Sequence, residues 1–142
     1  MNIPNKLPTI VATRIPHKDR HVVPGQLFGH DFPLRIEPMV FNIARDQAQN
    51  YNGGYWKFYS LSNGGFYMAP DADKTFQVQC PNHYQGELSS DAFGITVCLI
   101  AYSYLSFSDH TRFARICANH FHLLKPYVET HPEAVKIYSA ID

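Results

Sequence analysis

The sequence predicts an α+β fold in a single domain, with a small antiparallel β-meander of about three strands packed with about four helices. Three observations lead to this prediction. The run from Tyr51 to Pro70 places two Gly-Gly pairs around an aromatic segment, which is typical of a β-hairpin. The run from Lys74 to Cys80 alternates polar and apolar residues, as a half-buried strand does. Beyond residue 89, apolar residues recur at helical spacing.

The chain is long enough for one core. It has 142 residues, of which 45% are hydrophobic and 14% aromatic. The first 21 residues differ from the rest, because Lys6, Arg14, Lys18 and Arg20 face a single acid, Asp19, among three prolines. Segments of this composition are usually solvated. We therefore expect residues 1–21 to form a mobile basic arm and residues 22–142 to form the domain.

The predicted helices begin at recognisable residues. Glu37-Pro38 places an acid and a proline in the first turn of a helix that ends before Asn50. A second helix begins at Ser89 or Ser90 and continues to Leu105; it is apolar nearly all round and therefore central. Asp109 is the expected cap of a third helix reaching Tyr127, and residues 132–141 form the last, short helix.

The predicted sheet consists of residues 55–62, 66–69 and 74–80, paired in that order. The turn positions are expected where glycine can adopt positive φ or where Asn-Gly favours a tight loop; they are Gly53, Gly54, Asn63, Gly64 and Gly65. The hairpin register decides which aromatic residues are exposed. A two-residue loop would pair Ser62 with Gly65 and leave both faces aromatic. A three-residue Asn-Gly-Gly loop would instead bury one face and leave the other wet.

We prefer the three-residue loop, which turns Trp56, Phe58, Phe66 and Met68 inward. The opposite face would then expose three tyrosines around one lysine, and such a surface supplies large contact area with polar tips. The candidate partner-binding residues on this face are Tyr55, Lys57, Tyr59 and Tyr67. The alternative is that these side chains pack against loops and the N-terminal arm.

The window YNGGYWKFYSLSNGGFYMAP resembles the central signature of the plasmid-encoded KlcA/ArdB antirestriction proteins. The resemblance extends from about residue 22 to the C-terminus. It includes the runs Val23-Pro24, Leu27-Phe28-Gly29, Glu37-Pro38-Met39-Val40-Phe41, Ser90-Asp91-Ala92-Phe93-Gly94-Ile95, His131-Pro132-Glu133-Ala134 and Ala140-Ile141-Asp142. Members of that family let incoming plasmid DNA escape type I restriction enzymes of the host. The resemblance implies this function here, and it adds the terminal Asp142 to the candidate partner-binding residues.

Charge limits how such a protein could work. Twelve Lys and Arg residues balance twelve Asp and Glu residues, so the overall field is weak. We expect neither tight duplex DNA binding nor mimicry of the DNA phosphate backbone, which would require a large excess of one sign of charge. The three cysteines are widely spaced and predicted to be reduced, as in the cytoplasm. No apolar stretch is long enough for a bilayer span, so we expect no membrane contact.

Sequence motifs of catalysis, metal binding and cofactor binding are absent: there is no G-x-S-x-G, no phosphate-binding glycine loop and no H-E-x-x-H. His120 and His122 are two residues apart on a predicted helix and point to opposite sides, so they do not form a metal site. We expect His120 to be a core histidine bonded to a backbone carbonyl. The C-x-x-H run at Cys80 is predicted to be a turn with a buried thiol.

The resemblance implies an antirestriction protein, and we expect it to be cytoplasmic, to be no enzyme, to need no cofactor and to bind a subunit of a host type I restriction enzyme. For a neutral chain the route is a contact with the restriction complex or interference with its DNA-dependent translocation or cleavage step. Two alternatives remain open at this point. One is a single-stranded nucleic-acid-binding protein that uses the exposed tyrosines as stacking platforms. The other is a small hydrolase with His and Asp side chains in a cleft.

Overall fold

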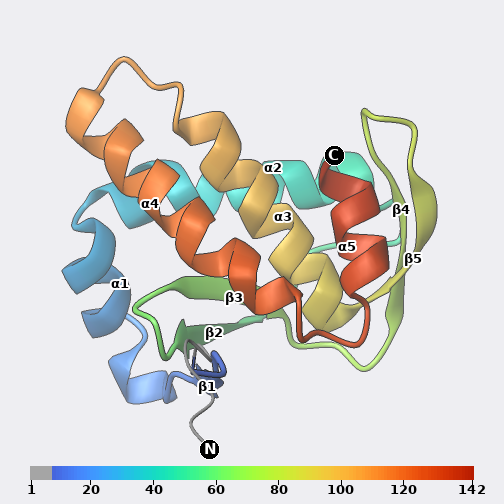
Figure 1. Cartoon of the computed structure of the whole chain (residues 1–142), viewed down its shortest axis with the longest axis horizontal. Helices are drawn as coiled ribbons and strands as arrows, with labels where there is room; N and C mark the ends of the chain where they lie inside the picture. The colour runs from blue at the N-terminus through green and yellow to red at the C-terminus, as the bar shows by residue number, and fades with distance from the viewer. Residues whose placement is uncertain (1–7) are drawn as a thin grey trace, which may run out of the picture.

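Helix α3 (Ser90–Leu105) lies at the centre of the molecule and contacts elements on every side. The structure, a computed structural model, describes residues 8–142. Figure 1 shows α3 between α4 and α5 and in front of α2, with one small sheet below and a separate hairpin at the right edge. Ten residues of α3 are buried, so the prediction of a central helix is confirmed. Ser89 caps it, since its Oγ accepts a hydrogen bond from the backbone N–H of Ala92 at 3.1 Å.

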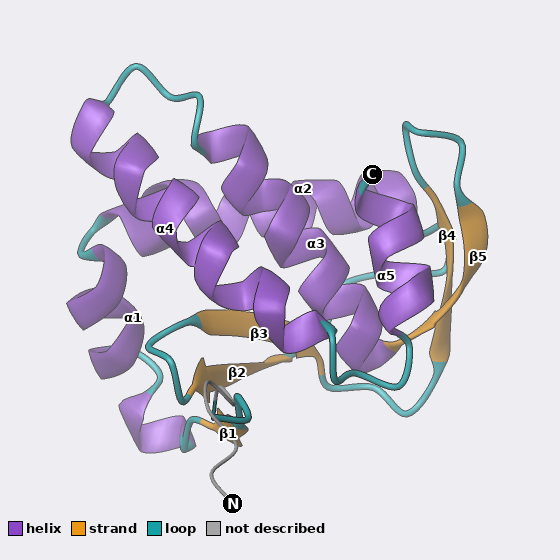
Figure 2. Cartoon of the chain, viewed as in Figure 1, coloured by secondary structure: helices purple, strands orange, loops and turns teal. Residues whose placement is uncertain are grey.

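The fold is α+β, as predicted, and Figure 2 shows the two small sheets in orange, one below the helices and one at the right edge of the molecule. In chain order the described elements are β1 (Ala12–Arg14), a 3-10 helix (His17–Asp19), α1 (Val22–Phe28), a π-helix (Phe32–Ile36), α2 (Glu37–Gln47), β2 (Trp56–Leu61), β3 (Phe66–Pro70), β4 (Thr75–Gln79), β5 (Gln85–Ser89), α3, α4 (Thr111–Val128) and α5 (Ala134–Ile141).

The β2–β3 hairpin has the predicted faces but a different loop. Tyr59 pairs with Tyr67, and the backbone N–H of Leu61 donates to the carbonyl of Gly65 at 2.9 Å. The loop is therefore residues 62–64, not the Asn-Gly-Gly of residues 63–65. A shift of two residues along the partner strand leaves every side chain on its predicted face. Gly64 has a φ of +94°, as a three-residue hairpin loop requires.

The third strand of the meander comes from an unexpected part of the chain. Strand β4 does not pair with β3, because α3 covers the outer edge of β3. There the Tyr102 hydroxyl donates to the carbonyl of Phe66 at 2.8 Å, and the Met68 N–H lies 3.5 Å from the sulfur of Cys98. Strand β4 pairs instead with β5, which the sequence analysis did not predict. A helix that covers a strand edge satisfies its backbone groups without a further strand.

The prediction of a mobile arm is wrong for residues 8–21, whereas residues 1–7 lie outside the described part of the chain. Strand β1 pairs with β2 in the register Ala12 to Leu61, so the sheet order is β1-β2-β3. Ile15 is buried and its N–H donates to the carbonyl of Phe58 at 2.8 Å. The free edge of β2 offers hydrogen bonds that outweigh the polar composition of this segment.

The helices before β2 were only partly predicted. Helix α1 and the π-helix were missed, and together with α2 they form a nearly continuous helical stretch from Val22 to Gln47. Proline is unfavourable inside a helix, and Pro24 and Pro33 are the reason that the sequence did not predict helix in this segment.

Helix α4 begins one residue later than predicted, with His110 rather than Asp109 at its N-cap. The three cysteines are free and buried, as predicted.

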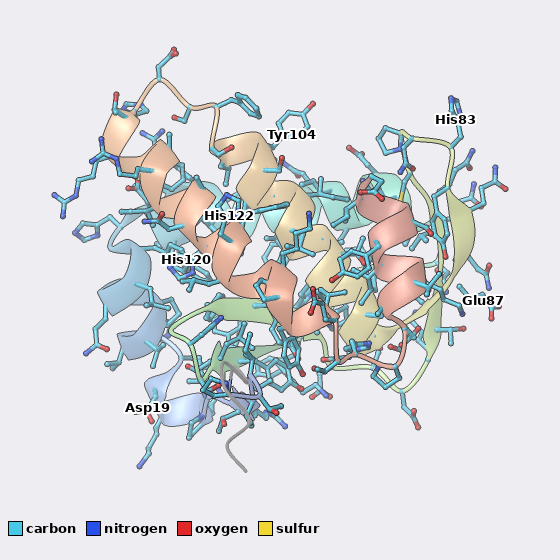
Figure 3. The ribbon with its side chains drawn as sticks, in the orientation of Figure 1. Asp19, His83, Glu87, Tyr104, His120 and His122 are labelled. Atoms are coloured by element: carbon cyan, nitrogen blue, oxygen red, sulfur yellow. The ribbon has the colours of Figure 1, made fainter. Side chains whose placement is uncertain are left out.

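His120 lies between α4 and α1 (Figure 3), packed against Phe28 with ring centroids 4.5 Å apart. It is buried as predicted, but its Nδ1 has no hydrogen-bond partner, so the predicted bond to a backbone carbonyl is absent at that atom. Burial lowers the pKa of His120 to about 4. The imidazole is therefore neutral in the folded protein at pH 7.

We expect the protein to lose stability between pH 6.5 and pH 4 because of His120. In this window an unfolded histidine binds a proton, whereas folded His120, with its pKa lowered from 6.5 to about 4, does not. Stability therefore falls as the pH falls. The expected loss is on the order of 1 to 3 kcal/mol, and it should be absent in His120→Leu. Urea unfolding at pH 7 and pH 4.5 measures it, and identical pH dependence in both proteins would contradict the assignment.

Candidate functional site

The predicted tyrosine face is only partly exposed. Tyr55 is 43% exposed, Lys57 and Tyr59 are half-buried, and Tyr67 is only 1% exposed. The ring of Tyr67 is stacked between Tyr59 at 4.7 Å and Tyr127 of α4 at 5.9 Å. The prediction that Tyr67 is exposed is therefore wrong. The residue points to the predicted side of the sheet, but the end of α4 covers that side.

Tyr67 belongs to a polar network below α4. Its hydroxyl donates to Asp91 Oδ1 at 2.7 Å, and His131 Nε2 lies 2.8 Å from Asp91 Oδ2. The pKa of Asp91 is lowered: burial acts to raise it, but the hydrogen bonds from His131 and Tyr67 outweigh burial. Burial and the Asp91 charge raise the pKa of Tyr67, so the phenol stays protonated and remains a donor.

His131 in this network is not available as a general base. Its Nδ1 accepts the backbone N–H of Glu133 at 3.0 Å, which leaves the proton on Nε2, where it is donated to Asp91. Both ring nitrogens are thus occupied, and a catalytic base needs one of them free to reach a substrate. The Asp-His pair that a hydrolase would use is here a structural link between α3 and the turn before α5.

Glu133 completes this link. Its carboxylate accepts the backbone N–H of Ser89 at 3.0 Å and the Ser89 hydroxyl as well. The negative charges of Glu133 and Asp91 lie at the N-terminus of α3, where the helix dipole favours them. The first turn of the central helix is thereby tied to the start of α5.

The C-terminal residue Asp142 is held against the β4–β5 hairpin. The side-chain amide of Asn82 donates to the carbonyls of Ser139 at 2.9 Å and Asp142 at 2.5 Å. Asn82 thus caps the end of α5. The C-x-x-H run is a turn in which Cys80 is buried. Figure 3 shows His83 at the exposed tip of this turn. Asp142 is exposed, and it is distant in sequence from the other predicted partner-binding residues, such as Tyr55.

A cavity lies where the N-terminal segment meets β2. It has a volume of about 480 Å³ and a largely apolar lining that includes Pro24, Phe32 and Phe58. Arg20 and Glu37 are its charged groups, and we call it the Arg20–Glu37 pocket. Apolar pockets with a few polar groups of this kind are the usual form of binding sites.

Arg20 is held rigidly in this pocket. Its guanidinium lies 3.8 Å from the ring centroid of Phe58 and 4.3 Å from that of Tyr55. One N–H donates to the backbone carbonyl of Trp56 at 2.6 Å. Stacking of this kind suits arginine and would be lost with lysine. Tyr55, a predicted partner-binding residue, therefore contacts the pocket through Arg20.

Glu37 provides a carboxylate without an ion pair in residues 8–142. Burial raises its pKa, although the charges of Arg20 and His21 partly offset that shift. A perturbed carboxyl in an apolar pocket is typical of a functional position. In the sequence, Glu37 marks a helix start and belongs to a run that carries the family resemblance, whereas Arg20 belongs to the basic N-terminal segment. Their proximity exists only in three dimensions.

Among the described residues, no three His, Cys, Asp or Glu side chains gather in a way that could hold a metal ion. Within the same range, none of the helices combines the length and the apolar character required to cross a bilayer.

Comparisons with known proteins agree with this fold. Residues 49–142 match the sequence model of the family described as antirestriction protein. The chain belongs to the antirestriction protein family. A KlcA antirestriction protein of Escherichia coli is 40% identical over 137 residues, 94% of each chain. The putative antirestriction protein YubI of Escherichia coli K12 is 31% identical over 136 residues, 93% of this chain and 96% of that relative.

A solved structure confirms the relationship to this antirestriction family. It covers 100% of both chains with a TM-score of 0.88 and 35% sequence identity. It represents the KlcA and ArdB proteins, which are described as having a novel fold and antirestriction activity against type I DNA restriction systems in vivo but not in vitro. The predicted resemblance to KlcA/ArdB and the predicted fold class are both confirmed.

In this antirestriction protein, the sequence runs that carry the resemblance meet in two places. The runs beginning at Ser90 and His131 form the link at the start of α3, through Asp91, His131 and Glu133. The runs that contain Pro24 and Glu37 line the Arg20–Glu37 pocket. One place ties the start of α3 to the start of α5, and the other lines a pocket.

Proposed function

We propose that this protein protects incoming DNA from type I restriction in the cytoplasm by binding a subunit of the host restriction enzyme, without catalysis of its own. The observation that carries the proposal is the match over both whole chains to KlcA and ArdB, for which antirestriction activity against type I systems in vivo is described. That activity is described as absent in vitro. An inhibitor that binds a protein state present only in the cell would behave in this way.

The balanced charge supports a protein partner over mimicry of DNA. Twelve basic and twelve acidic residues give a net charge of zero. A phosphate mimic requires a dense array of carboxylates, and a duplex-binding protein requires a basic surface. Contacts with a protein instead depend on a few aromatic and arginine anchors in partly buried positions. Arg20, stacked on Tyr55 and Phe58, has this character.

The two alternatives receive less support from the structure. Tyr67 is buried and therefore cannot stack on a base of single-stranded nucleic acid. The guanidinium of Arg20 already lies over the ring of Tyr55 and occupies that face. A hydrolase that uses His131 lacks a free ring nitrogen. We therefore infer a partner contact at the Arg20–Glu37 pocket and at Tyr55, whose ring lies against Arg20, with Lys57 and Asp142 as separate positions to test.

Glu37→Gln is expected to reduce protection while leaving the fold intact. The change keeps the side-chain shape and removes a charge that burial disfavours, so the melting temperature should stay within a few degrees. Loss of one hydrogen bond to a charged group costs about 1.5 to 3 kcal/mol, or roughly 10- to 100-fold in affinity. Phage plating efficiency on a host with a type I system, with and without the protein, measures the effect.

Arg20→Lys tests the same contact from the other side, because lysine keeps the charge but not the planar stacking. The matched controls are Glu129→Gln and Arg115→Lys, both exposed and outside the pocket. Both controls should protect as well as the unchanged protein. Crosslinking in the same cells should join the unchanged protein to a restriction subunit. Full protection by both pocket variants would place the contact elsewhere.

A further inference from the structure

A second cavity adjoins the Arg20–Glu37 pocket across α1. Its volume is about 530 Å³, and Gly25, Gly29 and His30 line both cavities. The second cavity is bounded by the C-terminal end of α1, the π-helix and the first turn of α4, which lie together at the left of Figure 1. We call the two cavities with the residues between them the α1 groove.

Arg35 is held in place within the second cavity by groups from two elements. Its Nε lies 3.0 Å from Asp31 Oδ1, and its Nη2 lies 3.1 Å from His110 Nε2. The guanidinium also lies 5.4 Å from the ring centroid of Phe113 in α4. An arginine fixed in this way loses little side-chain entropy when it binds a carboxylate.

The groove carries a cationic group that is free to act on a partner. Arg112 lines it, is exposed, and makes no ion pair with any residue in the range 8–142. His30 lies where the two cavities meet. The carboxylates that line the groove are Asp31, already paired with Arg35, and Glu37 at the far end. The second cavity therefore favours a ligand with negative charge.

Gly25 points to a close approach by that ligand. It lies inside α1, its φ is not positive, and an added Cβ would meet no atom within 4 Å. Folding thus does not require glycine here, and glycine inside a helix is less favourable than alanine. Gly29 differs, because its φ of +60° at the end of α1 explains the residue. Gly25 lines both cavities, where a side chain would narrow the groove.

We propose that the α1 groove binds an acidic, extended segment of the protein partner, with Arg35 and Arg112 paired to its carboxylates and its backbone passing over Gly25. The identity of that partner rests on the function proposed above. A protein segment fits better than a nucleic-acid strand, because a peptide can place its carboxylates at Arg35 and Arg112 alone. A continuous run of phosphates would also meet Glu37 at the far end of the groove, a carboxylate without an ion pair in residues 8–142. Leu34, next to Arg35 in the chain, is an exposed apolar residue and suits an apolar side chain of a peptide.

Binding is tested directly by NMR with two probes of matched charge, a synthetic peptide of alternating glutamate and leucine and an oligothymidylate. The peptide is expected to shift the backbone amide signals of Gly25, Gly29 and Arg112, and the shifts should disappear in Arg112→Glu. Shifts caused by the oligothymidylate alone would overturn the proposal in favour of a nucleic acid. Absence of shifts at these amides with either probe would overturn it entirely.

Cells provide the second test, through Gly25→Leu and Arg112→Glu. Each is expected to lower protection in the phage plating assay at least tenfold, with an unchanged or higher melting temperature for Gly25→Leu. Arg115→Glu, on the same helix but outside the cavity, is the matched control and should protect fully. If Gly25→Leu fails to fold, Arg112→Glu decides. Full protection by Arg112→Glu would overturn the proposal. A native protein that gives no protection would instead refute the proposed function, and the NMR result would then decide about the groove.

Discussion

Gly94→Val is expected to destabilise the native fold strongly. An added Cβ at Gly94 would lie 2.4 Å from the carbonyl oxygen of Met68 and 2.5 Å from the Cα of Ala69. These are backbone atoms of β3 and cannot rotate away. Helix α3 would have to move off the strand edge, which would also break the bond from Tyr102 to Phe66. Overpacking alone costs about 1 to 3 kcal/mol, and broken edge contacts add to it, against a total stability of about 5 to 15 kcal/mol.

Circular dichroism and soluble yield measure this effect, with Gly94→Ala as the milder variant. Gly25→Ala is the matched control, because it also adds a methyl group to a helical glycine but meets no atom within 4 Å. That control should be neutral or slightly stabilising. A Gly94→Ala protein that melts at the same temperature as the unchanged protein would show that α3 does not lie against the edge of β3.

Trp56→Ala is expected to destabilise the protein by on the order of 3 to 5 kcal/mol. The indole is 2% exposed, its Nε1 donates to the Tyr51 hydroxyl at 3.0 Å, and it packs edge-on against Phe41 and Tyr51. Its removal leaves a cavity and an unpaired hydroxyl. For a domain of this size, the expected fall in melting temperature is roughly 10 to 20 °C.

The neighbouring residue gives the contrast for this prediction. Tyr55→Ser alters a side chain that is 43% exposed, so the melting temperature of this variant should differ from that of the unchanged protein by only a few degrees. It should lower protection, because Tyr55 forms one side of the stack around Arg20. Thermal unfolding and the plating assay separate the two effects. A stable, inactive Trp56→Ala together with an unfolded Tyr55→Ser would mean that the two faces of β2 are assigned in reverse.

Sequence alone determined the elements whose signals are local. The apolar run of α3 with its Ser89 cap, the alternation of β4 and the Asn-Gly turn are properties of neighbouring residues, and each occurs at or near its predicted position. The alternation of side chains also assigned Trp56 and Phe58 to the buried face, because a register error of two residues preserves the face. The family was recognisable from the same local runs.

Tertiary structure decided what depends on contacts between distant segments. Strand β1 exists because β2 offers a free edge 45 or more residues away, and β4 was excluded from that sheet because α3 covers β3. Tyr67 lies on the face of β3 that the alternation of side chains predicts to be exposed, but Tyr127 of α4 covers it. Arg20 and Glu37 are ordinary surface residues in the sequence, and only the packing of the N-terminal segment on β2 joins them in one pocket. Pairing and burial are set by the free energy of the whole chain, which local propensity does not contain.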